Sequence, residues 1–429
     1  MKTYNLPNPD SWKEICKRPV FNTRDLTEQV NAIMDDVRLN GDSALYRYAQ
    51  KFDQCTLTEL QVRPEEFETA SSLVSIELKQ AIQVAKANIE KFHTAQVEES
   101  KVIETMPGVF CWRKSVGIEK VGLYIPGGTA PLFSTILMLG IPAKIAGCNE
   151  ILLCTPPSSA GSIHAAILFT AQLLGITQVY KVGGAQAIAA MCNGTDSIPA
   201  VSKIFGPGNQ FVTKAKELAQ LSGVAIDMPA GPSEVLVIAD KTCVPAFVAA
   251  DLLSQAEHGA DSQVVLLSDD AQVLEEVKVQ LAIQLATLPR MEMAQQALDK
   301  SFMVRCASME QCFELSNVYA PEHVIIASEN AESLAEGVVN AGSVFLGNYS
   351  CESAGDYASG TNHTLPTNGF AKAYSGVSVD SFVRKITFQK LSAEGIQGIG
   401  AAIETMAEAE ELFAHKNAVS LRLKSLENG

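Results

Sequence analysis

Gln255 and His258, near the end of a predicted helix, are the first side chains in this sequence that could carry chemistry. Their i, i+3 spacing places them on one helical face, and Pro245 and Gly259 suit its start and its end. The carboxyl end of a helix carries partial negative charge, which favours a bound cation. Imidazole is the commonest protein metal ligand and an amide oxygen is a rarer one. The pair indicates a metal site, with a polar helix end as the alternative.

A second candidate is the adjacent pair Glu322 and His323, which follows Ala320-Pro321 and precedes a predicted strand. Neighbours on a strand would face opposite ways, but a loop can present both to one cavity. Histidine titrates near working pH and can take a hydroxyl proton, while a carboxylate can activate water. These are the two proton transfers needed to oxidise an alcohol and then an aldehyde. A polar turn is the alternative.

Two further polar pairs lie nearer the C-terminus. Asp356 and His363 flank a glycine-bearing loop that can fold back and bring them near one site, or can be simply solvated. Glu410 and His415 are five residues apart and would diverge on a regular helix, which predicts a break before Lys416. A charged helix surface is the alternative for the latter pair. The remaining histidines, at 93 and 164, have no polar neighbours and are predicted to be structural.

The candidate catalytic and metal-binding residues lie in segments that resemble the histidinol dehydrogenases. The segments are IDMPAGPSE and DLLSQAEHG within 226–259, YAPEH at 319–323, GNYSCESAGDYASGTNH at 347–363 and EAEELFAHKNAV at 408–419. The resemblance continues upstream in VGLYIPGGTAPLFSTILM, KVGGAQAIAA and IFGPGN. It covers nearly the whole chain in the same order and is weakest over the first hundred or so residues.

The resemblance implies a role for each site residue. It implies His323 as the base for the alcohol and Glu322 as the activator of water. It implies zinc ligation by Gln255, His258, Asp356 and His415. Substrate contacts are implied for these four and for Ser233, His323, His363 and Glu410. NAD contacts are implied for Tyr124, Gln186 and Asn209.

The implied activity is the NAD-dependent oxidation of L-histidinol to L-histidine through bound L-histidinal, with two NAD used in succession. Zinc would act as a template that holds the imidazole and amino nitrogens of the substrate. The family also implies an intertwined homodimer in which His415 completes the zinc site of the partner. Apolar residues of the last stretch, such as Leu412, Phe413 and Leu421, have few local partners, which agrees with packing on a second subunit.

Two other classes of enzyme stay open at this point. An aldehyde dehydrogenase could use Cys351, which lies in a Gly/Ser-rich loop, as a nucleophile. A zinc hydrolase could use Glu322 to activate water and would need no NAD.

The usual GxGxxG dinucleotide fingerprint is absent. The nearest pattern, GPGNQF at 206–211, has Phe211 in place of the third glycine, and a second glycine turn lies at 182–186. Backbone N–H groups in such turns can hold phosphates without the full fingerprint. We therefore expect a weaker grip on NAD than in ordinary Rossmann dehydrogenases.

Composition excludes several classes of partner. The 429 residues carry a net charge of -15 with scattered basic residues, which argues against binding nucleic acid or acidic membranes. The uncharged run 121–143 contains Pro and Gly at positions that break a membrane span. The N-terminus lacks the apolar core of a signal peptide, and ten singly spaced cysteines suggest reduced thiols. These features predict a cytoplasmic protein.

The pattern of apolar runs predicts an α/β fold. Residues 23–95 are predicted to be mostly helical, and from about 119 short apolar runs alternate with helical stretches, as in parallel sheets of βαβ units. The family implies two Rossmann-like, aldehyde-dehydrogenase-like domains, one formed by 23–123 with 233–377 and the other by 124–232. Small helical extensions are expected at 1–22 and 378–429.

Overall fold

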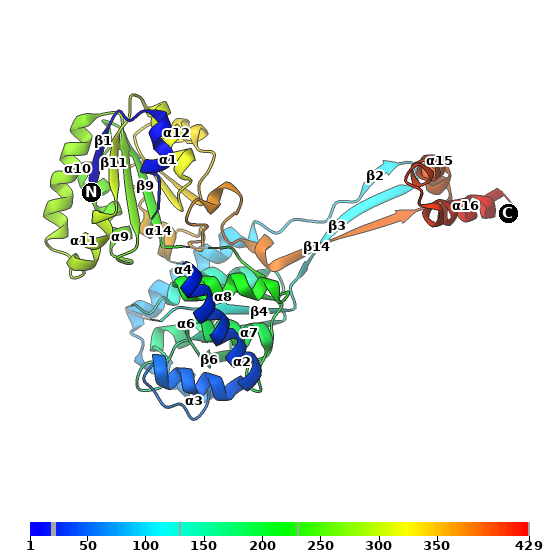
Figure 1. Cartoon of the computed structure of the whole chain (residues 1–429), viewed down its shortest axis with the longest axis horizontal. Helices are drawn as coiled ribbons and strands as arrows, with labels where there is room; N and C mark the ends of the chain where they lie inside the picture. Colours follow the sequence, from blue (N-terminus) through cyan, green and yellow to red (C-terminus); the bar gives the residue numbers. More distant parts are fainter. Residues whose placement is uncertain (19–22, 128–129, 230, 428–429) are drawn as a thin grey trace.

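The computed structural model describes residues 1–18, 23–127, 130–229 and 231–427. Two parallel sheets covered by helices form the body of the molecule, and a long antiparallel arm extends from it (Figure 1). The two sheets confirm the predicted α/β class. Every helix within the described ranges is too short or too polar to cross a membrane.

Sheet 1 has six parallel strands in the order β1-β11-β10-β9-β12-β13. The strands are β1 (Lys2–Asn5), β9 (Glu234–Ala239), β10 (Gln263–Ser268), β11 (Phe302–Arg305), β12 (His323–Ala327) and β13 (Ser343–Leu346). The associated helices are α1 (Trp12–Ile15), α9 (Pro245–Ala256), α10 (Ala271–Leu285), α11 (Met291–Asp299), α12 (Met309–Tyr319), α13 (Ala331–Leu334) and α14 (Glu352–Tyr357). Along β9, Val235 and Val237 pack with α9, α10 and α11, while Leu236 and Ile238 pack with α1 and α12. The strand is therefore apolar on both faces, as a central parallel strand must be.

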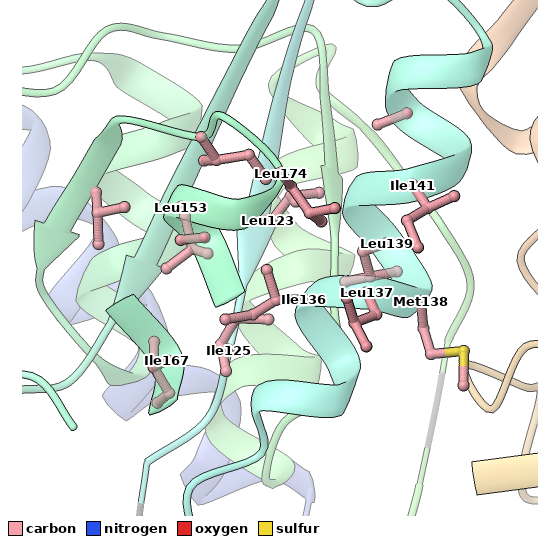
Figure 2. Packing of buried hydrophobic residues seen from close by; sticks show 14 of the residues in the cluster. Leu123, Ile125, Ile136, Leu137, Met138, Leu139, Ile141, Leu153, Ile167 and Leu174 are labelled. Carbon is pink, nitrogen blue, oxygen red and sulfur yellow. The ribbon is translucent and has the colours of Figure 1, made fainter. Parts of the chain in front are cut away.

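Sheet 2 has five parallel strands in the order β6-β5-β4-β7-β8. The strands are β4 (Lys120–Tyr124), β5 (Glu150–Thr155), β6 (Gln178–Lys181), β7 (Lys203–Phe205) and β8 (Ala225–Ile226). The helices are α5 (Phe133–Ile145), α6 (Ala165–Leu173), α7 (Gly184–Asn193) and α8 (Gln210–Leu221). Figure 2 shows Leu123 and Leu153 of the sheet facing Ile136 and Ile167 of α5 and α6. Each such fully buried aliphatic side chain contributes about 1.5–3 kcal/mol.

Three N-terminal helices form an outer layer on sheet 2. They are α2 (Thr23–Phe52), α3 (Pro64–Leu73) and α4 (Ile76–Thr94), and they pack mainly on α7, α6 and α5 respectively. Helix α2 is amphipathic, and its apolar stripe, which includes Val30 and Val37, is buried against the helices of sheet 2. These three helices thus pack with sheet 2, whereas the family likeness grouped residues 23–123 with 233–377. An amphipathic stripe fixes the face that is buried but does not identify the surface that buries it.

The arm is a three-stranded antiparallel sheet followed by two helices. Strand β3 (Val109–Gly117) pairs with β2 (Ile103–Met106) on one side and with β14 (Val383–Leu391) on the other. Helices α15 (Ala393–Ala409) and α16 (Phe413–Glu427) pack on each other at the far end (Figure 1). The terminal extensions were predicted to be helical, but the first contains β1 and the second contains β14. Short 3₁₀ turns lie at Pro9–Ser11, Ala335–Gly337, Phe370–Lys372 and Val379–Phe382.

The glycine turn after β7 yields a stability prediction. Gly206 has φ +126°, and a Cβ there would overlap the carbonyl oxygen of Tyr124 on the neighbouring strand. We expect Gly206→Ala to lower the free energy of unfolding by about 2–4 kcal/mol in urea titration. Gly223→Ala is the matched control, because Gly223 also has positive φ, +86°, but open space around it. That variant should lose only about 1–2 kcal/mol, and equal losses would contradict the steric argument.

Candidate active site

The predicted catalytic and metal-binding residues of the body gather at the amino edge of sheet 1. Strand β12 begins at His323, next to β9, whose first residue Glu234 follows Ser233. Helix α9 runs back across the sheet and ends at Ala256, so Gln255 lies in its last turn. His258 lies just after the helix rather than within it, with its N–H donating to the Gln255 carbonyl at 3.2 Å. The amino ends of parallel strands thus assemble one polar cluster.

His323 is buried and held in a defined protonation state. Its Nδ1 lies 3.1 Å from the carbonyl oxygen of Glu234. A carbonyl can only accept, so Nδ1 carries the hydrogen and Nε2 is left with a free lone pair. Burial lowers the pKa of His323, which keeps the imidazole neutral. Nε2 lies 3.9 Å from Oδ1 of Asp356 and is therefore available as a base beside the metal candidates.

Glu322 is held by the same residue as His323. Its Oε2 accepts a 2.8 Å hydrogen bond from the backbone N–H of Glu234 and lies 3.7 Å from His323 Nδ1. Burial, chiefly, raises the pKa of Glu322 well above its ordinary value. When ionised, such a carboxylate is a stronger base toward water than an exposed one.

The predicted metal ligands of the body fit a cation. His258 Nε2 and Asp356 Oδ2 are 3.9 Å apart, and ligand atoms of His258, Glu352 and Asp356 lie within 4.8 Å of one another. The Gln255 side chain is fully buried, yet neither its amide oxygen nor its amide nitrogen has a hydrogen-bond partner among the described residues. An unsatisfied buried amide is costly, and a metal bound to its oxygen would relieve that cost. An N/O donor set of this kind suits zinc.

Glu352 belongs to this cluster and was missed from the sequence. Both of its carboxylate oxygens are buried without a hydrogen-bond partner in the described structure, and one lies 3.7 Å from His323 Nδ1. Burial, followed by the nearby Asp356, Glu322 and Asp251, raises its pKa well above the ordinary value. The available signal was the i, i+4 spacing from Glu352 to Asp356, which places both on one face of α14.

His363 supports the cluster from the side of sheet 2. Its Nδ1 donates to the backbone carbonyl of Asp356 at 2.8 Å, so Nε2 accepts the hydroxyl hydrogen of Thr135, 3.1 Å away. Both ring nitrogens are therefore engaged, and His363 fixes the backbone of a metal candidate. Ser233 lies half-buried beside Glu234 at the same edge.

Glu410 and His415 are not brought to this cluster within one chain. Both are exposed: Glu410 follows the end of α15 and His415 lies in the first turn of α16, at the end of the arm and away from sheet 1 (Figure 1). Glu411, with φ +58°, turns the chain between the two helices, so the predicted break before Lys416 is confirmed.

The predicted NAD contacts line one cavity on sheet 2. Tyr124, Gln186 and Asn209 all border a space of about 1050 Å³ at the carboxyl edge of this sheet. The Tyr124 hydroxyl accepts the Gly184 N–H at 3.0 Å, and the Asn209 side chain caps the start of α8. Pro131 also lines the cavity, four residues before the Thr135 that holds His363. The segment 130–135 thus connects the cavity with the polar cluster.

Asp251 behind the cluster yields a prediction for the metal-free protein. Burial raises its pKa to about 7. The unfolded chain ionises first, near pH 4, so the contribution of Asp251 to stability falls as pH rises from about 4 to about 7. Asp251→Asn removes this loss, and its unfolding free energy should exceed that of the parent by about 1–3 kcal/mol at pH 8 but not at pH 4. Glu292→Gln, at an exposed site, is the charge-matched control. A difference that does not vary with pH would contradict the assignment.

Comparisons with known proteins agree along the whole chain. Residues 16–423 match the histidinol dehydrogenase family. Histidinol dehydrogenase of Bacteroides thetaiotaomicron is 59% identical over 426 residues, covering 99% of this chain and 100% of the relative. That of an Escherichia coli strain is 52% identical over 426 residues, covering 99% and 97%.

Solved structures give the same result. The crystal structure of histidinol dehydrogenase from Elizabethkingia anophelis superposes with a TM-score of 0.98 at 59% identity, covering 100% of this chain and 99% of that one. An acetylating aldehyde dehydrogenase from Geobacillus thermoglucosidasius, at 16% identity and a TM-score of 0.50 over 88% and 93% of the two chains, shares the fold alone. The chain belongs to the histidinol dehydrogenase family, an oxidoreductase family of histidine biosynthesis that uses zinc and NAD.

Proposed function

We propose that this chain oxidises L-histidinol to L-histidine through bound L-histidinal, using two NAD, at the amino edge of sheet 1. The observation that carries the proposal is the placement of His323 and Glu322. A neutral imidazole with a free Nε2 and a buried carboxyl face one cluster of metal-ligating side chains. Alcohol oxidation followed by aldehyde oxidation needs these two groups.

In the first step His323 Nε2 takes the hydroxyl proton of L-histidinol as the substrate carbon loses a hydride to NAD. The Nδ1–H bond to the Glu234 carbonyl becomes stronger as the ring gains charge, which stabilises the imidazolium. In the second half of the reaction Glu322 takes a proton from the water that adds to the aldehyde. From the described residues its buried carboxylate accepts one backbone hydrogen bond, so lone pairs remain for that water.

Gln255, His258 and Asp356 would hold the zinc, and its positive charge would fix the substrate imidazole and amino nitrogens. Ser233 and Glu410 are proposed to contact the substrate. His363 orients Asp356 through its backbone carbonyl. Holding the substrate by its imidazole lets L-histidinal stay bound between the two oxidations.

Tyr124, Gln186 and Asn209 are proposed to bind NAD in the cavity of sheet 2. The nicotinamide would reach the substrate past the segment 130–135, which borders the cavity and holds His363. The ten cysteines are all free thiols, which supports a cytoplasmic location. Cys351 precedes the buried Glu352 at the start of α14, and the proposed mechanism assigns it no role.

We also propose an intertwined homodimer with two shared active sites. The arm holds His415 far from the other metal candidates of its own chain (Figure 1). It also exposes apolar side chains, among them Ile103, Phe388, Phe413 and Leu421. A partner that covers these side chains could also place His415 of the partner subunit at the zinc.

The division of roles predicts separable half-reactions. Two NADH should form per histidine, counted by absorbance and by product analysis. Glu322→Gln should slow oxidation of L-histidinal more than that of L-histidinol, and His323→Ala the reverse, each by about 10²–10⁴-fold. Cys351→Ser is the control and should retain full activity. Equal slowing of both half-reactions by both variants would show the division to be wrong.

The shared site predicts complementation between inactive subunits. His258→Asn and His415→Asn should each lose zinc and activity as homodimers, because each removes one ligand from every site. In a heterodimer both defects fall in one site and the other is intact. Mixing equal amounts under exchanging conditions should restore about a quarter of wild-type activity and the matching zinc content. If both ligands came from one chain, every site would carry a defect and no activity would return.

A further inference from the structure

Arg18, at the end of the first described range, is a cation buried close to the catalytic pair. The Arg18 side chain is only 15% exposed and that of its partner Glu234 only 3%. The guanidinium donates through both Nε and an Nη to the two carboxylate oxygens of Glu234, the second at 2.8 Å. A two-point pair of this kind fixes the orientation as well as the distance of both groups.

Arg18 also holds the chain that leads into Glu322. Its Nη donates to the backbone carbonyl of Tyr319 at 2.9 Å, and its guanidinium lies 3.9 Å from the centre of the Tyr319 ring. Tyr319 ends α12, and Ala320 follows in the left-handed region with φ +52°. The Arg18 side chain therefore anchors the turn that places Glu322 and His323 at the edge of the sheet.

Glu234 connects Arg18 with both Glu322 and His323. Its backbone N–H donates to Glu322, and its backbone carbonyl accepts from His323. Its side chain, besides binding Arg18, accepts the backbone N–H of Asn368 at 3.0 Å. Glu234, which hydrogen-bonds to both members of the catalytic pair, is thus tied at its side chain to the N-terminal segment.

We propose that Arg18 is a positioning residue, which through Glu234 and the Tyr319 turn sets the geometry of Glu322 and His323 together. The inference rests on the proposed roles of that pair. It gives the N-terminal segment a function in catalysis although Arg18 reaches none of the reacting atoms. Because catalytic groups must be placed to within a fraction of an ångström, loosening the anchor should lower turnover more than binding.

The test is Arg18→Met, which keeps the length of the side chain and removes the guanidinium. We expect kcat per zinc-loaded dimer to fall by about tenfold or more, with KM for L-histidinol and NAD within about twofold. Oxidation of L-histidinol and of L-histidinal should fall together, unlike in the variants of Glu322 and His323. Turnover of Arg18→Ala should rise when methylguanidinium is added but not when methylammonium is added, since only methylguanidinium can make the two-point contact with Glu234.

Glu66→Gln is the matched control. Glu66 pairs at 2.7 Å with Lys181, which is also buried, on the opposite domain and outside the proposed site. It should lose stability without losing kcat. Should Arg18→Met fail to fold, Arg18→Lys carries the same test, because it keeps the charge and loses the two-point contact.

If Arg18→Met lowers the melting temperature but leaves kcat per zinc-loaded site unchanged, the inference is overturned. Arg18 would then only stabilise the fold. A change confined to KM would overturn it as well. An inactive parent protein would instead contradict the proposed function, so the two failures are distinguishable.

Discussion

Buried negative charge at the amino edge of sheet 1 is the constraint on which the rest of the site depends. Glu234, Glu322, Glu352 and Asp356 lie close together with little or no exposure. Within the described residues only Glu234 has an arginine or lysine partner, Arg18. Carboxylates in such a place either take up protons or require a cation, because desolvation of a charge costs several kcal/mol. The amide oxygen of Gln255, which has no hydrogen-bond partner among the described residues, adds one more possible metal ligand. Zinc, used by this family, would resolve both problems if bound at the proposed site, and metal binding would then complete the charge balance of the local fold.

The two proposed sites lie at opposite edges of their sheets. Cofactor sites in open parallel sheets ordinarily lie at the carboxyl ends of strands, where loops and helix N-termini present N–H groups. The NAD site proposed for sheet 2 follows this rule, since Tyr124, Gln186 and Asn209 border a cavity at its carboxyl edge. Sheet 1 presents its amino edge instead, where α9 ends and β9 and β12 begin. A helix C-terminus and the carbonyl of Glu234 suit a cation and an imidazole N–H, whereas a helix N-terminus suits a phosphate. The polarity of each edge thus matches the charge it is proposed to bind.

The strands that are buried on both faces could be predicted from the sequence. Elements whose packing partners lie far away in the sequence could not be placed. The runs at 235–239, 263–267 and 324–327 are apolar on both faces, and each is a strand of sheet 1. Strands β3 and β14, on the exposed arm, mix charged and apolar residues and carry no such signal. The outer helices α2–α4 have clear apolar stripes, but their partners depend on the tertiary fold. Similarly, Glu352 was missed because α14 has only six residues, and Arg18 because its partner is 216 positions away in the sequence.

The arm accounts for the proposed division of the active site between two chains. Strands β3 and β14 carry α15 and α16 beyond the body, and their exposed apolar side chains can be covered only by another surface. A metal ligand supplied from such an arm, as proposed for His415, would tie zinc binding to assembly. Donors within the body would hold the metal incompletely until a second subunit arrives, and the substrate imidazole would then enter a closed coordination shell. Closure of the coordination shell would keep the reactive aldehyde bound between the two oxidations, because the aldehyde could leave only if its bond to the metal were broken.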